Sequence, residues 1–150
     1  MLVATPPCFV LQWAPLDLAR VYSLADTPAN GAIVLMVGTV RASTTGRAVR
    51  YLEYEAYTPM ALAVFQDIGR QVQQQWPINQ VVIHHRVGKL QVGEVSVAIA
   101  VGSPHRGEAF AACQFAIDTL KHHAPVWKKE HWLDGSSDWV SIGDCEAHNR

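Results

Sequence analysis

The chain has 150 residues, of which 49% are hydrophobic and 17% are charged, and its net charge is −1. These values exclude a disordered chain and a general nucleic-acid or membrane binder, and the length suits one domain over residues 1–150. Cys8, Cys113 and Cys145 are far apart and form no CxxC pair, which argues against a zinc site or a disulfide framework. No apolar run reaches transmembrane length. We therefore expect a soluble, cytoplasmic protein in which any basic site is local.

The first fifty residues alternate between apolar and polar segments. CFVLQWA (8–14) predicts a strand, and PLDLARVYSLA (15–25) predicts a short helix. GAIVLMVGTV (31–40) is apolar and rich in β-branched residues, which predicts a strand buried on both faces. RASTTGRAVR (41–50) is polar and predicts a loop.

The middle of the chain predicts a strand, a helix and a second strand. VRYLEYEAY (49–57) alternates and predicts a strand, after which Thr58 and Pro59 should cap and open a helix. INQVVIHHRVG (78–88) predicts the next strand. The helix between them should bury the apolar residues at helical spacing, which are Ala61, Val64, Phe65, Ile68 and Val72.

The last third predicts two strands around a helix and a closing hairpin. Gly88 and Gly93 should bracket a turn before the strand EVSVAIAVGS (94–103). Ser103 and Pro104 should start a helix that ends before Pro125 and buries Phe110, Cys113, Ile117 and Leu120. VWKKEHWL (126–133) and DWVSI (138–142) predict a hairpin. The sum is an α+β domain with six or seven strands and three helices.

Seven of the twelve lysines and arginines lie in three short segments. Each segment borders the end of a predicted core element, so the three could converge on one pocket for a small anionic ligand. For each residue, a solvated surface charge is the competing interpretation, and it is the better one for Arg47 and Arg50. The cations are Arg41, Arg47 and Arg50, then Arg106 beside His105 at the start of the third helix, and finally Lys121, Lys128 and Lys129.

The segment KHHAPVWKKE (121–130) holds three of the four lysines. A lysine in the last turn of a helix gains stability from the helix dipole, so Lys121 has a purely structural explanation as well. Strand alternation puts Lys128 on the same side as Glu130, and we expect Trp127 to anchor the core on the opposite side. A partly desolvated lysine beside other cations can act as acid, base or nucleophile.

Several segments resemble the MoaE family, the large catalytic subunits of molybdopterin synthase. The resemblance covers residues 8–140, and its last two motifs are the most specific. The matching segments are MVGTVR (36–41), YLEYEAYTPMA (51–61), HRVGKLQVGE (85–94), SPHRGEAFAACQF (103–115) and LKHHAPVWKKE (120–130).

The resemblance implies a sulfurtransferase of molybdenum cofactor biosynthesis. Family members convert cyclic pyranopterin monophosphate to molybdopterin, with sulfur from the C-terminal thiocarboxylate of a small ubiquitin-like subunit. The implied fold is α+β of the α/β-hammerhead type with an added antiparallel sheet. The implied assembly is a homodimer within a heterotetramer, and no metal or cofactor is implied.

Residue by residue, the resemblance assigns two roles. Lys121 and Lys128 match the catalytic lysines. The residues that match the substrate pocket are Arg41, His105, Arg106 and Glu130. Family members often bring an arginine from the partner's C-terminal region, and Arg150 is the only candidate for it here.

Two other classes of protein fit part of this pattern. An inactive scaffold could still dimerise and bind the ubiquitin-like subunit, although it would not need both lysines together with Arg41, His105 and Arg106. A phosphate-binding regulator would fit the basic cluster, but it predicts a glycine-rich phosphate loop, which the sequence lacks.

Overall fold

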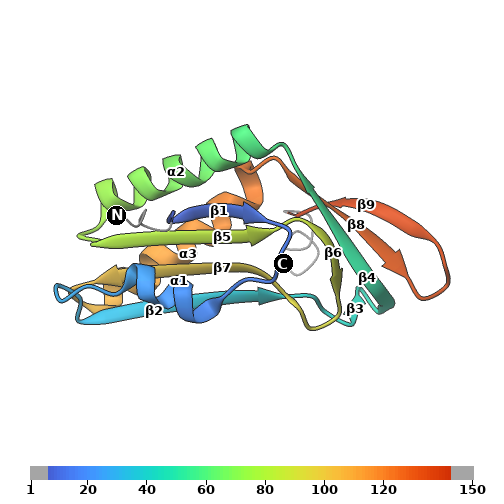
Figure 1. The fold of residues 1–150 in the computed structure, drawn as a ribbon, viewed down its shortest axis with the longest axis horizontal. Coiled ribbons are helices and arrows are strands. Elements are labelled where there is room, and N and C mark those ends of the chain that lie inside the picture. Colours follow the sequence, from blue (N-terminus) through green and yellow to red (C-terminus); the bar gives the residue numbers. More distant parts are fainter. Residues whose placement is uncertain (1–6, 143–150) are drawn as a thin grey trace, which may run out of the picture.

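The computed structural model describes residues 7–142, and a four-stranded sheet forms its centre (Figure 1). Its order is β1-β5-β7-β2. β1 pairs with β5 in parallel, and the other neighbours are antiparallel. The strands are β1 (Phe9–Gln12), β2 (Ala32–Thr39), β5 (Gln80–Arg86) and β7 (Val95–Ser103).

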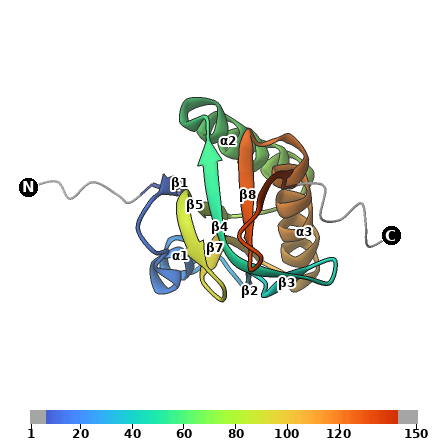
Figure 2. The same cartoon turned by 90° about the vertical axis from the view of Figure 1, so that its right-hand side faces the viewer.

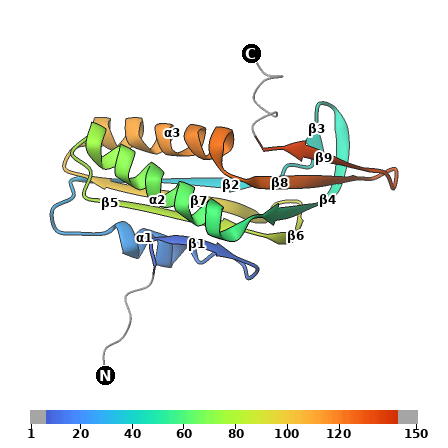
Figure 3. The same cartoon turned by 90° about the horizontal axis from the view of Figure 1, so that it is seen from above.

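Three helices cover this sheet, two on one face and one on the other (Figure 3). They are α1 (Leu18–Ala25), α2 (Thr58–Gln75) and α3 (Arg106–His123). α2 and α3 share the main core through residues such as Phe65, Ile68 and Leu120. α1 covers the opposite face with Val21 and Ala25. Among the described helices, none has the length and apolar character needed to cross a membrane.

A second sheet lies at one end of the first (Figures 1 and 2). Its strand order is β3-β4-β8-β9, and β6 is a fifth strand that pairs with β4 outside this order. All of its pairings are antiparallel. Its strands are β3 (Ser43–Thr44), β4 (Arg47–Ala56), β6 (Gly88–Gln91), β8 (Val126–Trp132) and β9 (Ser137–Ser141).

The HRVGKLQVGE segment carries the chain from the first sheet to the second. Gly88 has a φ of 91°, which glycine adopts without strain, and it begins β6, which a single residue separates from β5. The buried Arg86 donates from Nε and Nη2 to the carbonyl oxygen of Trp13, at 3.2 and 2.8 Å, and from Nη1 to Glu94 at 3.2 Å. Glu94 also accepts from the backbone N–H of Gln91 at 2.8 Å. This segment therefore stabilises the crossing between the sheets.

The expected α+β composition is confirmed, but residues 7–142 contain nine strands instead of six or seven. The predicted loop 41–50 is a hairpin, since Thr45 and Gly46 adopt positive φ angles of 48° and 79° between β3 and β4. The predicted turn between Gly88 and Gly93 contains β6. The two strands that the sequence did not predict, β3 and β6, are short and polar, so their sequences show little of the alternation that is typical of a strand.

Three predictions about burial and helix starts were wrong in detail. β2 is not buried on both faces, because it is an edge strand and Leu35 is 37% exposed. Phe110 is 62% exposed, because the first half of α3 buries small residues such as Ala109 and Ala112 instead. Tyr57 and His105 are N-caps in place of the predicted Thr58 and Ser103, and Asp17 caps the first helix. Each helix nevertheless begins within three residues of its predicted start.

Candidate active site

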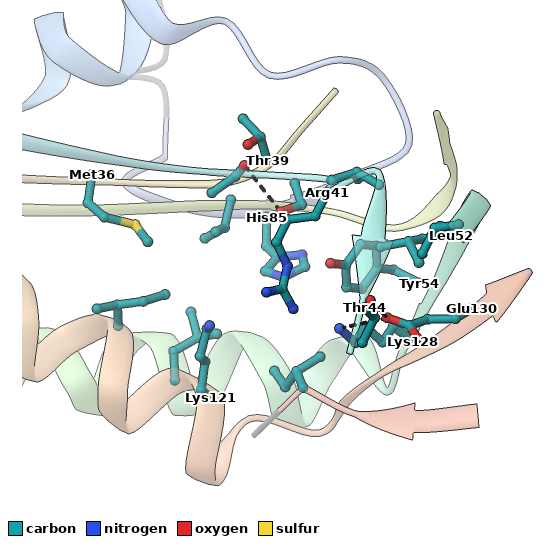
Figure 4. A pocket seen from close by; sticks show the side chains of 18 residues that line it. Met36, Thr39, Arg41, Thr44, Leu52, Tyr54, His85, Lys121, Lys128 and Glu130 are labelled. Carbon is teal, nitrogen blue, oxygen red and sulfur yellow. Dashed lines mark hydrogen bonds and ion pairs between the residues drawn. The ribbon is translucent and has the colours of Figure 1, made fainter. Parts of the chain in front are cut away.

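A cavity of about 360 Å³ lies where the first sheet, the end of α3 and the second sheet meet (Figure 4). Its lining includes apolar residues such as Val97 of β7, Leu120 of α3 and Leu52 of β4. Polar side chains line the rest of it. The lining side chains with polar atoms are Thr39, Arg41, Thr44, Tyr54, His85, Ser96, Lys121, Lys128 and Glu130.

Lys121 and Lys128 reach this cavity from two different elements. α3 ends at His123, and Pro125 then leads into β8. Lys121 lies in the last turn of the helix and is half-buried, whereas Lys128 lies inside the strand and is buried. The structure therefore brings together the two lysines that the sequence singled out.

Lys128 is paired with a buried carboxylate. Its Nζ lies 3.2 Å from Oε1 of Glu130, which also accepts a hydrogen bond from Oγ1 of Thr44 at 3.0 Å. The Glu130 side chain is only 2% exposed, and its Oε2 has no hydrogen-bond partner among the described residues. A buried charge pair of this kind holds both side chains in one geometry.

The alternation along β8 was predicted correctly, but its direction was wrong. Lys128 and Glu130 face the interior together with Val126 and Trp132. Trp127 does not anchor the core, because 48% of its surface is exposed. The inward lysine is possible because Glu130 compensates its charge and the cavity leaves its ammonium group room.

Arg41 completes the cationic side of the cavity. Val40, just before it, is held to the β6–β7 turn by backbone hydrogen bonds, to Glu94 at 3.0 Å and from Gly93 at 2.8 Å. The side chain of Arg41 extends into the cavity between Lys121 and Lys128 (Figure 4). Three cations and one carboxylate thus face the same space, an arrangement that favours an anionic ligand.

His105 and Arg106 do not line this cavity within one chain. They lie at the opposite end of α3, where they border a separate hollow with Gly31, Pro104 and Gly107. Fifteen residues of helix separate Arg106 from Lys121, which corresponds to about 22 Å. The prediction that all basic segments converge on one pocket is therefore wrong for a single chain.

Four other cations, all on strands of the second sheet, have structural partners. Arg47 pairs with Asp134 at 2.9 Å and stacks over the ring of Trp132 at 4.3 Å. Arg50 and Lys89 lie over the ring of Tyr51, at 6.0 and 4.2 Å. Lys129 lies 5.7 Å from the ring of Trp139. Arg150 lies outside the described residues, as does Cys145.

Comparison with known proteins identifies the family. The sequence profile of the MoaE protein family matches residues 11–123, most of the chain. The chain belongs to the MoaE family. A relative from Nostoc sp. (strain PCC 7120), named molybdopterin synthase catalytic subunit, is 61% identical over 139 residues, which cover 92% of this chain and 84% of the relative.

Solved structures of the MoaE fold agree with this assignment. Molybdopterin synthase from Staphylococcus aureus matches with a TM-score of 0.86 and 38% identity, and the match covers 91% of this chain and 98% of the other. A chain in the complex of subunits 1 and 2 of molybdopterin-converting factor from Helicobacter pylori shares the fold with a TM-score of 0.74, at 20% identity. That match covers 89% of this chain and 90% of the other.

Two cavity residues in this MoaE family member were missed by the sequence reasoning. His85, at the end of β5, is buried, and its Nδ1 lies 2.7 Å from the carbonyl oxygen of Arg86. The ring of Tyr54 packs edge-on against the His85 ring, with centroids 5.1 Å apart. The signal available was a histidine pair inside an apolar strand, which alone does not tell which ring meets a cavity.

Burial of His85 predicts a loss of stability in weak acid. Burial lowers the pKa of His85 from 6.5 to about 4, and it also lowers the pKa of His84. The unfolded chain therefore binds protons that the native chain does not bind, so stability falls as the pH decreases from 6.5 towards 4. For His85 the loss is about 3 kcal/mol, measurable by urea unfolding at a series of pH values. Stability that stays constant across this interval would contradict a buried, neutral His85.

Neither cysteine of the described part lines the cavity. Burial raises the pKa of Cys113 to about 11, so its thiol is a poor nucleophile at neutral pH. Residues 7–142 also contain no group of three or more His, Cys, Asp or Glu side chains that could hold a metal ion. The polar groups that the described residues bring to the cavity are amines, a guanidinium, an imidazole, a carboxylate and hydroxyls.

Proposed function

We propose that this chain is the catalytic subunit of a molybdopterin synthase, and that it converts cyclic pyranopterin monophosphate to molybdopterin by adding the dithiolene sulfurs. The observation that carries the proposal is the convergence of Lys121, Lys128 and Arg41 on one cavity beside the buried Glu130. The name of the Nostoc relative supports it. The proposed site residues are Arg41, Lys121, Lys128 and Glu130, with His105 and Arg106 from a second copy.

The sulfur in this proposal comes from a partner protein. Neither described cysteine borders the cavity, so a carrier that enters from outside fits the site better than a cysteine of the described part. The carrier we propose is a small ubiquitin-like subunit with a thiocarboxylate on its C-terminal glycine. Each transfer forms a C–S bond at a carbon of the pterin side chain and breaks the C–O bond at that carbon, so the oxygen group leaves. Water then cleaves the bond between sulfur and the glycine acyl carbon and returns the glycine to a carboxylate.

The proposed roles follow from the surroundings of each side chain. Arg41 lies between the lysines and would bind the substrate phosphate, because a guanidinium offers a planar pair of donors to such an anion. Lys128, held by Glu130, would transfer protons on the pterin. Lys121, which is more exposed, would meet the thiocarboxylate tail.

The position of His105 and Arg106 supports a site shared between two copies. One chain cannot bring Arg106 to its own Lys121. His105 and Arg106 can therefore reach the cavity with the lysines only if a second copy of the chain supplies them. We propose a homodimer with a small subunit at each far end, in a chain of the α/β-hammerhead type with an added antiparallel sheet. A cytoplasmic location stays a prediction from the sequence.

Mixing two inactive variants tests this shared site. Arg106→Ala and Lys128→Ala chains should each be inactive alone, yet a mixture that exchanges subunits should contain dimers with one intact site. Random pairing predicts a recovery of about one quarter of the wild-type rate. The rate of molybdopterin formation is measured before and after subunit exchange. Activity that stays absent in mixtures shown to contain heterodimers would mean that a single chain supplies both Arg106 and Lys128 to each site, and it would contradict the shared site.

The main alternative is an inactive scaffold that binds the ubiquitin-like subunit. The discriminating experiment mixes the chain with a thiocarboxylated small subunit and cyclic pyranopterin monophosphate, and follows both complex formation and molybdopterin. We expect a complex and product. A stable complex that yields no product would favour the scaffold and overturn the proposed function.

A further inference from the structure

His85 is a cavity residue for which the mechanism above has no role. It lies at the end of β5, and its side chain borders the same cavity as Lys121 and Lys128 (Figure 4). Tyr54, which is the cross-strand neighbour of Lys128, packs against the His85 ring. His85 is 3% exposed, so its orientation is set by the surrounding packing.

The hydrogen bond of His85 identifies its tautomer. Nδ1 lies 2.7 Å from the carbonyl oxygen of Arg86, and a carbonyl can only accept. Nδ1 must therefore carry the proton. Because burial keeps the ring neutral, Nε2 has a lone pair and no proton. Among residues 7–142, this Nδ1 contact is the only hydrogen bond found for the ring.

A neutral acceptor differs from most of the polar groups around it. The side chains of Arg41, Lys121 and Lys128 donate hydrogen bonds and, as cations, do not accept them. Glu130 is a charged acceptor: its Oε1 already accepts from Thr44 and Lys128, whereas its Oε2 has no hydrogen-bond partner among the described residues. The cavity thus combines a cationic region suited to phosphate with a fixed acceptor on its wall.

We propose that His85 contacts the substrate and selects its ring system, with Nε2 accepting a hydrogen bond from an N–H or O–H group of the pterin. This inference rests on the proposed function, and it adds the residue that recognises the heterocycle. In this arrangement the cations bind the phosphate, and His85 recognises the pterin ring system that carries the phosphate. An anion bound at the cations gains nothing from His85 unless it also carries a donor that reaches Nε2.

Two amide variants separate this role from a structural one. In His85→Asn the amide nitrogen can still donate to the carbonyl of Arg86, but the side chain is too short to reach the Nε2 position. In His85→Gln the amide oxygen can take the place of Nε2 as acceptor. Binding of cyclic pyranopterin monophosphate and of inorganic phosphate is measured by calorimetry for both variants and for the wild type.

We expect His85→Asn to bind the pterin about tenfold more weakly and His85→Gln to lose about threefold or less, with phosphate affinity unchanged in both. Equal pterin affinity in the wild type and His85→Asn would overturn the proposal, and so would a parallel loss of phosphate affinity. His85→Leu serves as the variant without an acceptor if His85→Asn does not fold. If the wild type itself does not bind the pterin, it is the proposed function that fails.

Discussion

Replacing Lys128 with alanine is expected to lower the rate of molybdopterin formation by at least ~10²-fold, because the site loses the amine that handles protons on the pterin. The same change leaves the buried carboxylate of Glu130 without its cation. We therefore also expect the free energy of unfolding to fall by about 3 kcal/mol. Single-turnover assays and urea unfolding measure the two effects separately.

A second variant separates activity from stability at this pair. Lys128→Met combined with Glu130→Gln removes both charges, so it should recover most of the lost stability and none of the activity. Lys129→Ala is the matched control, since Lys129 is the next residue on β8 and points away from the cavity. A Lys128→Ala chain that turns over at the rate of Lys129→Ala would contradict the role of Lys128.

Replacing Lys121 with alanine is expected to lower the rate by about 10²-fold, because the incoming thiocarboxylate loses a cation in the cavity. Its effect on stability should be small, at most about 1 kcal/mol, because a half-buried lysine in the last helical turn contributes mainly through the helix dipole. The measurement is the same single-turnover assay at saturating small subunit, together with thermal unfolding.

Lys121→Arg shows which property of Lys121 matters. Arginine keeps the positive charge but does not release its proton, so it should restore activity if Lys121 acts only by charge. His122→Ala, at the exposed neighbouring position, is the control. Full activity in Lys121→Ala would remove Lys121 from the mechanism and would leave it a structural role, to which the helix dipole contributes.

The site shows how far the sequence carries a structural prediction. Pro125 indicated that α3 ends near Lys121, and the alternation in KHHAPVWKKE indicated that Lys128 and Glu130 share one face. Periodicity identifies which residues share a face, but not which face is buried. That choice depends on the packing of β8 between β4 and β9, so Trp127 was placed inside when it is exposed.

Other features depend on contacts between distant segments. The motif match predicts that His105 and Arg106 line the substrate pocket, but it does not tell which copy of the chain would supply them. The tautomer of His85 follows from the contact between its Nδ1 and the carbonyl oxygen of Arg86. The spacing of residues in the sequence does not predict this contact. The family motifs also mix roles, since Arg86 and Glu94 stabilise the fold while Lys121 and Lys128 line the cavity.

The most direct test of the account is a single-turnover reaction with the wild-type chain, thiocarboxylated small subunit and cyclic pyranopterin monophosphate. Mass spectrometry follows the C-terminus of the small subunit and the pterin in the same samples. The account predicts that two thiocarboxylates become carboxylates for each molybdopterin formed. Conversion of thiocarboxylate to carboxylate while the pterin gains no sulfur would contradict it.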